Sequence, residues 1–348
     1  MKLISPDLYE KLLDFAETND GKVALLGVFG ILLYIGRAAN LGSSGYWTIL
    51  LSVIACTFAE KHRLRILPLA MIVLLYIYPF TGWSTSHVME SALTNNGLHG
   101  QINLYVLRHS TVGAFFIFYL TVLYGAARFK DWAIFRRPVL ALVLFFSMLL
   151  VLAGSDAIRG WPQVYLWSFV STFSAYIWFL SYALQDCQSR NPSPLYVQVG
   201  MLHPFWGATT APYGKGAAYI RQVEAKTPRE LATSQIKGLK LMLICIGMLG
   251  AKTCFKYLTR KLHIPDFEDT LLPHYLRGAS YSIPVCWVSL VTAYIEWVAF
   301  LPIWGNLVVG CARMAGFNIL RSTYKPERAT SIAEFFNRFD YYLPAFNR

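Results

Sequence analysis

Long apolar runs separated by short polar segments dominate the sequence. A helix that spans a bilayer needs about 20 mostly apolar residues, and eight runs approach that length. We therefore predict transmembrane helices over residues 23–37, 46–59, 66–80, 111–127, 138–153, 164–184, 239–255 and 283–311. Several runs are short, which indicates little tilt, local thinning of the bilayer or packing within protein. The pattern predicts an all-α, polytopic integral membrane protein with about eight transmembrane helices plus interfacial helices.

Helix-start signals lie outside these runs as well. The stretch SPDLYEKLLDF is amphipathic, with Ser5 placed to cap a helix whose first residue is Pro6. Thr227 is placed to cap a charged amphipathic helix from Pro228, because Glu230 follows three residues later. Pro302 interrupts the last apolar run, so that run is either two helical pieces or one kinked helix.

The composition excludes an ordinary soluble protein. Hydrophobic residues make up 55% of the 348 residues and charged residues only 14%, whereas soluble domains carry about 25% charged residues. The net charge is +12, but the basic residues form short clusters between apolar runs and no separate basic domain. This distribution is typical of the positive-inside rule and argues against binding of nucleic acid.

The charge clusters predict a topology for a single membrane domain over residues 1–348. The basic loops 60–65, 128–137 and 185–240 fall on one side of the membrane if eight helices alternate. We assign these loops and both termini to the cytoplasm, so residues 186–240 form a long cytoplasmic loop. Its segment HPFWGATTAPYG is compatible with a re-entrant turn whose backbone faces protein or water.

Familiar catalytic and metal-binding patterns are missing. The six cysteines form no CxxC pair, and the seven histidines form no HExxH motif. We predict no metal and no bound cofactor. His109 lies at the mouth of the fourth span, where it is either an interfacial residue or a general base.

Two charged residues lie within apolar runs, namely Lys252 in LGAKTCF and Glu296 in TAYIEWVAF. An unpaired charge at membrane depth costs about 3 kcal/mol or more, so both are candidate substrate-binding residues. Two interpretations stay open at this point. Lys252 and Glu296 form an ion pair that holds two helices together, or Glu296 lines a polar tunnel for substrate.

The end of the sequence predicts one further helix. Ser331 and Glu334 form a capping box beside Arg328, and Pro344 ends the helix. Aromatic residues recur along one side of it, which predicts an interfacial helix with Arg338 free to contact lipid headgroups.

The segment SIAEFFNRFDYYL resembles a motif of the membrane-bound O-acyltransferase (MBOAT) family. Phe335 and Phe336 match the aromatic pair of that motif, Arg338 and Phe339 match its Arg-aromatic step, and Asp340 stands where the family has histidine or asparagine. The upstream segments CARMAGFNILRSTYKPERATSIAEFFNR and PYGKGAAYIRQVEAKTPRELATSQIKGLKL are similar to a poorly characterised bacterial branch. The resemblance covers about the last half of the chain.

The resemblance implies acyl transfer in a bacterial inner membrane. The donor would be acyl-CoA or acyl carrier protein from the cytoplasm, and the acceptor a hydroxyl or amine of an envelope lipid, glycan or metabolite. Membrane lipids, this donor and a secreted or periplasmic acceptor or partner protein would be its partners. Asp340 would have the catalytic role of binding or polarising a reactant, and Asn337 and Arg338 would contact substrate.

One feature of the family lacks a counterpart in this sequence. The family's catalytic histidine lies tens of residues beyond the motif, whereas no histidine follows His274. We therefore expect the chain as given to be either an acyltransferase that uses another base, such as His109 or His203, or an inactive or truncated relative. The alternative is a non-enzymatic membrane protein, a transporter or assembly subunit, with Lys252 and Glu296 on a permeation path.

Overall fold

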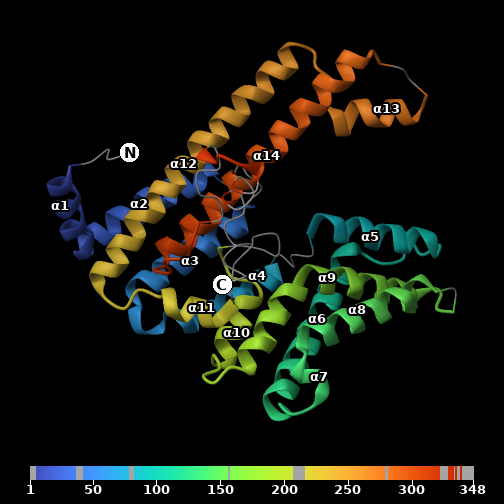
Figure 1. Ribbon diagram of the computed structural model, residues 1–348, viewed down its shortest axis with the longest axis horizontal. Helices are drawn as coiled ribbons and strands as arrows, with labels where there is room; N and C mark the ends of the chain where they lie inside the picture. The colour runs from blue at the N-terminus through green and yellow to red at the C-terminus, as the bar shows by residue number, and fades with distance from the viewer. Residues whose placement is uncertain are drawn as a thin grey trace. The chain divides into compact units, whose positions relative to one another are not determined.

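The computed structural model is all-helical over the residues that it describes (Figure 1). These residues are 5–36, 42–77, 82–155, 157–206, 216–278, 281–321, 328–332, 334 and 338. Within them every predicted apolar run falls on a helix, and no β-strand occurs. The helical part of the prediction is therefore confirmed.

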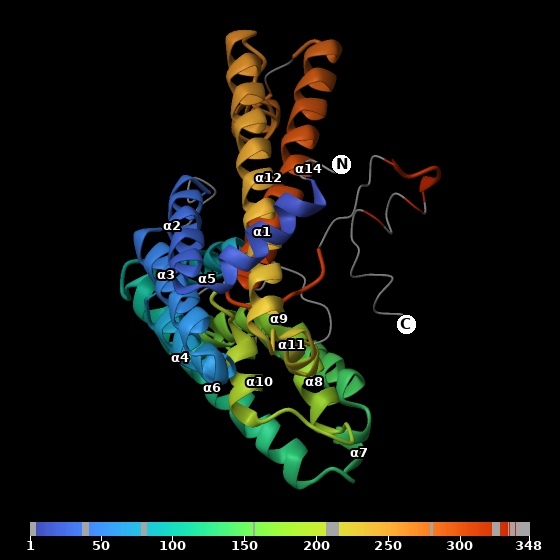
Figure 2. The same ribbon diagram turned by 90° about the vertical axis from the view of Figure 1, so that its left-hand side faces the viewer.

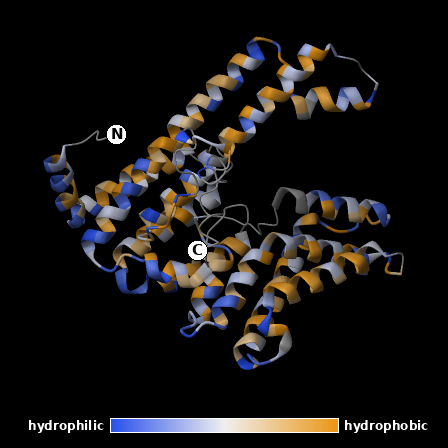
Figure 3. Ribbon diagram, viewed as in Figure 1, coloured by the Kyte–Doolittle hydropathy of each residue, from blue (hydrophilic) through white to orange (hydrophobic). Residues whose placement is uncertain are grey.

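Five helices in the described ranges are long and apolar enough to cross a membrane. They are α2 (Asn19–Gly36), α6 (Leu104–Arg128), α9 (Trp161–Cys187), α12 (Pro228–Lys261) and α14 (Ile283–Met314). Two shorter apolar helices are α3 (Ser43–Phe58) and α8 (Pro138–Gly154). Apolar colouring follows much of α8 and α14 in Figure 3. These helices support a multi-pass membrane protein.

The chain divides into two compact units, and each is described by itself. The first unit comprises Met1–Tyr46 and Ala225–Arg348, and the second comprises Trp47–Glu224. In the first unit α12 and α14 lie side by side along much of their length (Figures 1 and 2). The helix α2 packs against α12, and α1 (Pro6–Glu17) packs against both.

The first helix begins and ends where short polar side chains satisfy its free backbone groups. The Leu8 N–H donates to Ser5 Oγ at 3.3 Å, and Pro6 occupies the first turn, which confirms the predicted cap. At the other end Thr18 Oγ1 donates to Phe15 O at 2.7 Å and accepts from Gly21 N at 3.0 Å. Thr18 thus closes α1 and opens α2, so the two helices follow each other with little intervening chain.

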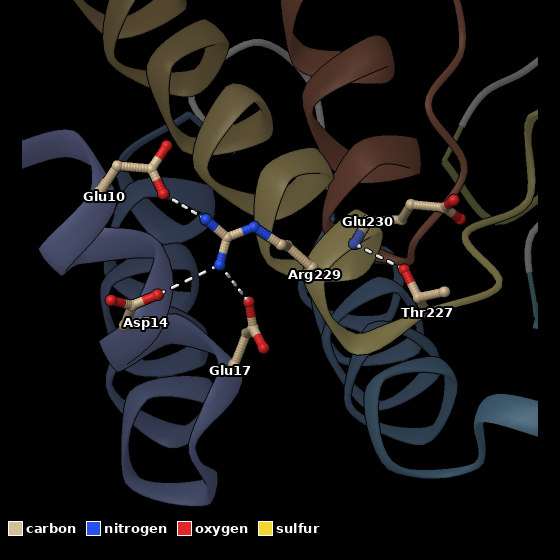
Figure 4. Close-up of polar contacts among 6 residues, drawn as sticks. All are labelled: Glu10, Asp14, Glu17, Thr227, Arg229 and Glu230. Atoms are coloured by element: carbon tan, nitrogen blue, oxygen red, sulfur yellow. Dashed lines mark hydrogen bonds and ion pairs between the residues drawn. The ribbon is translucent and has the colours of Figure 1, made fainter. Parts of the chain in front are cut away.

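A three-carboxylate contact ties α1 to the start of α12 (Figure 4). Arg229 lies 3.1 Å from Asp14 Oδ1 and 3.0 Å from Glu17 Oε1, and it also pairs with Glu10. The carboxylates share one face of α1 because their spacing is four and three residues. Beside them Glu230 N donates to Thr227 Oγ1 at 3.2 Å, which confirms the predicted cap.

The long helices α12 and α14 meet closely at one end. A Cβ on Gly238 would lie 3.0 Å from Gly310 O, so the two backbones nearly touch there. Beside this crossing Ser234 Oγ donates to Arg313 O at 2.9 Å, and Gln235 Nε2 donates to Met314 O at 3.1 Å. These donors satisfy carbonyls at the C-terminus of α14, which intrahelical bonds leave open.

One prediction about these helices was too fragmented: the amphipathic segment from Pro228 and the seventh apolar run form one helix of 34 residues. The last apolar run is one helix with Pro302 inside it, so of the two alternatives for this run the single helix holds. Packing of a long helix against its neighbours outweighs a local breaker such as proline.

The second unit packs around an aromatic core. It contains η2 (Glu60–His62), α4 (Arg63–Ile77), α5 (Gly82–Asn95), α6, α7 (Ala133–Arg136), α8, α9, α10 (Leu195–Leu202), α11 (Gly216–Val223) and most of α3. The helices α6 and α9 bring Phe115, Phe173 and Tyr176 together in fully buried positions. Phe115 and Tyr176 stack with ring centroids 5.2 Å apart, a geometry that adds to the stabilisation from burial.

The predicted long loop 186–240 has helical structure of its own. It contains α10, α11 and the beginning of α12. Buried Asp186 accepts from Ser193 N at 3.0 Å and from Gln198 Nε2 at 3.1 Å, which fixes the turn between α9 and α10. His203, Phe205 and Trp206 are buried at the start of the predicted re-entrant segment. The rest of that segment, residues 207–215, lies outside the described ranges.

Candidate functional site

A pocket of about 770 Å³ lies between α12 and α14, beside the segment that joins them. Its titratable lining residues are Lys252, Lys256, Arg260, His263, Asp266 and Glu296. Both charged residues singled out within the apolar runs therefore reach the same pocket. Its volume falls within the range of about 300–1,000 Å³ that small-molecule sites occupy.

The predicted ion pair between Lys252 and Glu296 is wrong. The partner of Glu296 is Lys256, with Nζ to Oε2 at 3.7 Å. Lys252 Nζ instead lies over the Phe300 ring, 5.5 Å from its centroid. Lys252 and Lys256 are one helical turn apart, so the sequence alone does not determine which lysine lies nearer to Glu296.

The observed pair opens onto the pocket. The Lys256 side chain is 40% exposed and that of Glu296 21%, and both line the pocket. The structure thus favours the second interpretation of Glu296, a residue that lines a polar site, over that of a helix clamp to Lys252.

The end of α12 places His263 at the pocket in an uncommon backbone conformation. His263 has φ of 55°, in the left-handed region that glycine usually occupies. Its N–H donates to Arg260 O at 3.0 Å, and Ile264 N donates to Thr259 O at 3.1 Å. These two bonds form a Schellman cap, which turns the chain back towards α14.

The joining segment closes this end of the pocket. It contains η3 (Phe267–Leu271), a short π-helix, and α13 (Leu272–Leu276). Ser289 Oγ of α14 donates to Pro265 O and so attaches the segment to that helix. Asp266 and Phe267 line the pocket from this side.

The terminal segment has part of its predicted geometry. Glu334 N donates to Ser331 Oγ at 3.1 Å, which confirms one half of the capping box. The Glu334 carboxylate accepts from Thr330 N at 2.8 Å and from Thr330 Oγ1 at 2.7 Å rather than from Ser331. These bonds, and those from Arg338, lower the pKa of Glu334 to about 2, so it is ionised at neutral pH.

The Arg338 side chain is paired with Glu334, whereas the sequence predicted it to be free. Its Nε and Nη2 donate to Glu334 Oε1 at 2.9 and 2.6 Å, so the guanidinium is not free for headgroups as predicted. A pair of this spacing stabilises the first turns of a helix. The candidate residues Asn337 and Asp340 lie outside the described residues, and their roles stay predictions.

The two histidines nearest to apolar segments have structural surroundings. His109 Nδ1 lies 2.8 Å from Tyr105 O, and Nε2 lies 2.9 Å from Tyr76 O. Both ring nitrogens thus face backbone carbonyls, which favours the interfacial role over that of general base. His203 is buried beside Tyr176, and burial lowers its pKa to about 4.

Sequence reasoning missed Lys256, Arg260 and His263 as site residues. The signal for the first two was present, since Lys252, Lys256 and Arg260 recur every four residues and therefore share a helix face. Comparison with known proteins adds no further candidate: no family model, curated protein or solved structure matches the chain.

Proposed function

We propose that the chain is an MBOAT-like acyltransferase scaffold with about eight transmembrane helices. It transfers an acyl group from cytoplasmic acyl-CoA or acyl carrier protein to a hydroxyl or amine of an envelope lipid, glycan or metabolite. The terminal motif supports the family, and the long apolar helices support a membrane-embedded reaction site.

The observation that carries this proposal is a charged pocket beside exposed apolar helix surface. An acyltransferase of this kind handles amphiphiles, which need a polar site for the head and an apolar surface for the chain. Lys252 and Glu296 supply the polar part from α12 and α14. The adjoining surface of α14 exposes Val291 and Ile295 to 50% and 43%.

The reaction is an exchange of one carbonyl substituent. The acceptor oxygen or nitrogen attacks the thioester carbonyl, a C–O or C–N bond forms, and the C–S bond breaks. The acceptor proton passes through a base to the leaving thiolate, so the products are an ester or amide and a thiol. Asp340 would bind or polarise a reactant. A water-poor site would exclude hydrolysis of the thioester.

The test is acyl transfer by membranes that contain the chain. Radiolabelled acyl-CoA and labelled acyl carrier protein serve as separate donors, and the extracted lipid and glycan fractions are assayed for label. Label should appear in one fraction and fall to background in Asp340→Ala, but persist in the control Asp7→Ala, which removes an exposed carboxylate of α1. An unchanged rate in Asp340→Ala would remove this residue from the site, and no label with either donor would refute the proposal.

The same pocket supports the alternative of a non-enzymatic transporter. A lysine and a glutamate within apolar helices are typical of a permeation path for a charged solute. Liposomes that contain the chain separate the two functions. Solute uptake that is lost in Glu296→Gln and unaffected by acyl-CoA would favour transport.

A further inference from the structure

Three cations of α12 form one stripe along the pocket. Lys252, Lys256 and Arg260 follow one another at intervals of four residues, and all three line the pocket. Because a helix rises 1.5 Å per residue, the stripe extends over about 12 Å of the helix axis. This length suits a polar headgroup better than a single small ion.

The described carboxylates that line the pocket are fewer than the cations. Glu296 Oε2 lies 3.7 Å from Lys256 Nζ, and Asp266 also lines the pocket. Among the described lining side chains, three cations against two carboxylates leave a formal charge of +1, with His263 counted as neutral. Within the described residues no carboxylate lies within 4 Å of the Lys252 or Arg260 side chains. The pocket therefore favours an anion.

Exposed aromatic residues lie beside the pocket on α12 and α14. Tyr257 and Tyr294 are 65% and 62% exposed, and Trp297, which lines the pocket, is 59% exposed. Tyrosine and tryptophan are enriched where a membrane meets water, because one part of each side chain is apolar and another polar. A ligand in this pocket therefore has access from the lipid phase.

We propose that the pocket binds the phosphate group of an anionic phospholipid, with the acyl chains against the exposed apolar faces of α12 and α14. The guanidinium of Arg260 has the planar geometry that phosphate oxygens accept from two N–H groups at once. Lys252 and Lys256 add charge along the rest of the headgroup. The inference rests on the proposed function only in taking this pocket as the substrate site.

Equilibrium binding of tritiated phosphatidylglycerol to the purified full chain in a neutral detergent tests the proposal. Phosphatidylcholine, whose headgroup is neutral overall, is the reference lipid. Phosphatidylglycerol should bind about tenfold more tightly or better, and Arg260→Gln or Lys252→Gln should each weaken it about tenfold, because each loses a charge-assisted contact. Glu296→Gln should strengthen it severalfold, since a negative charge leaves the pocket.

The matched control is Lys261→Gln, which removes a cation from the same end of α12 at an exposed position that does not line the pocket. This substitution should change the dissociation constant for phosphatidylglycerol by less than about twofold. The proposal is overturned if both lipids bind alike, if Lys261→Gln weakens binding as much as Arg260→Gln, or if Glu296→Gln weakens it. A misfolded variant cannot imitate the expected gain in Glu296→Gln.

A second arm distinguishes a lipid from a soluble phosphate compound. Acyl-CoA is added as competitor, and its own binding is measured in the absence of lipid. If acyl-CoA binds in a manner that depends on Arg260 and phosphatidylglycerol does not bind, the proposed lipid ligand is wrong and the pocket binds a soluble phosphate donor. Lipid binding without acyl transfer would refute the proposed function alone, and acyl transfer that does not depend on Arg260 or anionic lipid would refute this inference alone.

Discussion

The close approach of α12 and α14 at Gly238 permits a quantitative prediction. In Gly238→Ala the new Cβ would lie 3.0 Å from Gly310 O, 3.1 Å from Arg313 Cβ and 3.2 Å from Met314 N. Two of these neighbours are backbone atoms of α14, so the helices must separate by a few tenths of an ångström. Small residues at such crossings let helices pack in membranes, where close van der Waals contact contributes much of the association.

The size of the effect follows from two opposing contributions. Overpacking of a well-packed contact costs about 1–3 kcal/mol, whereas alanine in place of glycine favours the helix by about 1 kcal/mol. Gly247→Ala is the matched control, because the same helix offers a glycine whose added Cβ meets nothing within 4 Å. The propensity gain is common to both variants, so Gly238→Ala should be less stable than Gly247→Ala by about 1–3 kcal/mol.

The assay is unfolding by sodium dodecyl sulfate in mixed micelles, followed by far-ultraviolet circular dichroism and analysed by linear extrapolation. Gly310→Ala should give an intermediate result, because its closest contact, 2.9 Å, is with Met242 Sδ, and a flexible thioether can move aside. Equal stability of Gly238→Ala and Gly247→Ala would refute the reasoning, since it would mean that the helices do not meet at this glycine.

Three further predictions concern other parts of the chain. His263→Gly should stabilise the chain by up to about 1 kcal/mol in thermal unfolding, because glycine adopts a φ of 55° without a Cβ clash; a loss would contradict the strained cap. The lowered pKa of His203 means that the unfolded chain binds a proton between about pH 6.5 and pH 4. The contribution of neutral His203 to the free energy of unfolding is therefore fully present above pH 6.5, and this free energy falls by up to about 3 kcal/mol as the pH drops towards 4. His203→Gln should remove this slope, and the same slope in the variant would exclude His203 as its cause. Arg229→Ala should speed amide exchange in residues 6–17 by no more than about fivefold, because exposed ion pairs contribute little stability and buried Leu13 and Ala16 keep α1 packed, whereas Arg229→Lys should retain part of the protection; unchanged exchange in Arg229→Ala would show that the ion pairs contribute nothing to holding α1.

The positions of the helices could be read from the sequence because apolar runs and short capping motifs act locally. Ser5 and Thr227 make the predicted bonds, since each involves residues only three positions apart. The contacts of Arg229 with α1 join residues 212 to 219 positions apart. No local pattern encodes such a contact, although the acidic face of α1 indicates that some cation lies opposite.

The site was predictable in part for the same reason. A lysine and a glutamate within apolar runs could be recognised one by one, because each is costly unless hydrated or paired. Their mutual geometry depends on the axial offset between α12 and α14, and one helical turn separates Lys256, the observed partner of Glu296, from Lys252. Arg260 and His263 were missed because they follow the apolar run, where charged residues are ordinary.

The two ends of the α12–α14 pair have different physical character, and this difference favours a binding role for the pocket. At one end the crossing at Gly238 and Gly310 is backed by buried Ser234 and Gln235, so the pair is fixed there without help from charges. At the other end Glu296 and Lys256 lie 3.7 Å apart and both line the pocket. A charge within an apolar helix is costly unless it is paired or hydrated, and apolar residues would fill a structural role at lower cost, so charges gathered at a pocket are more simply explained by a ligand.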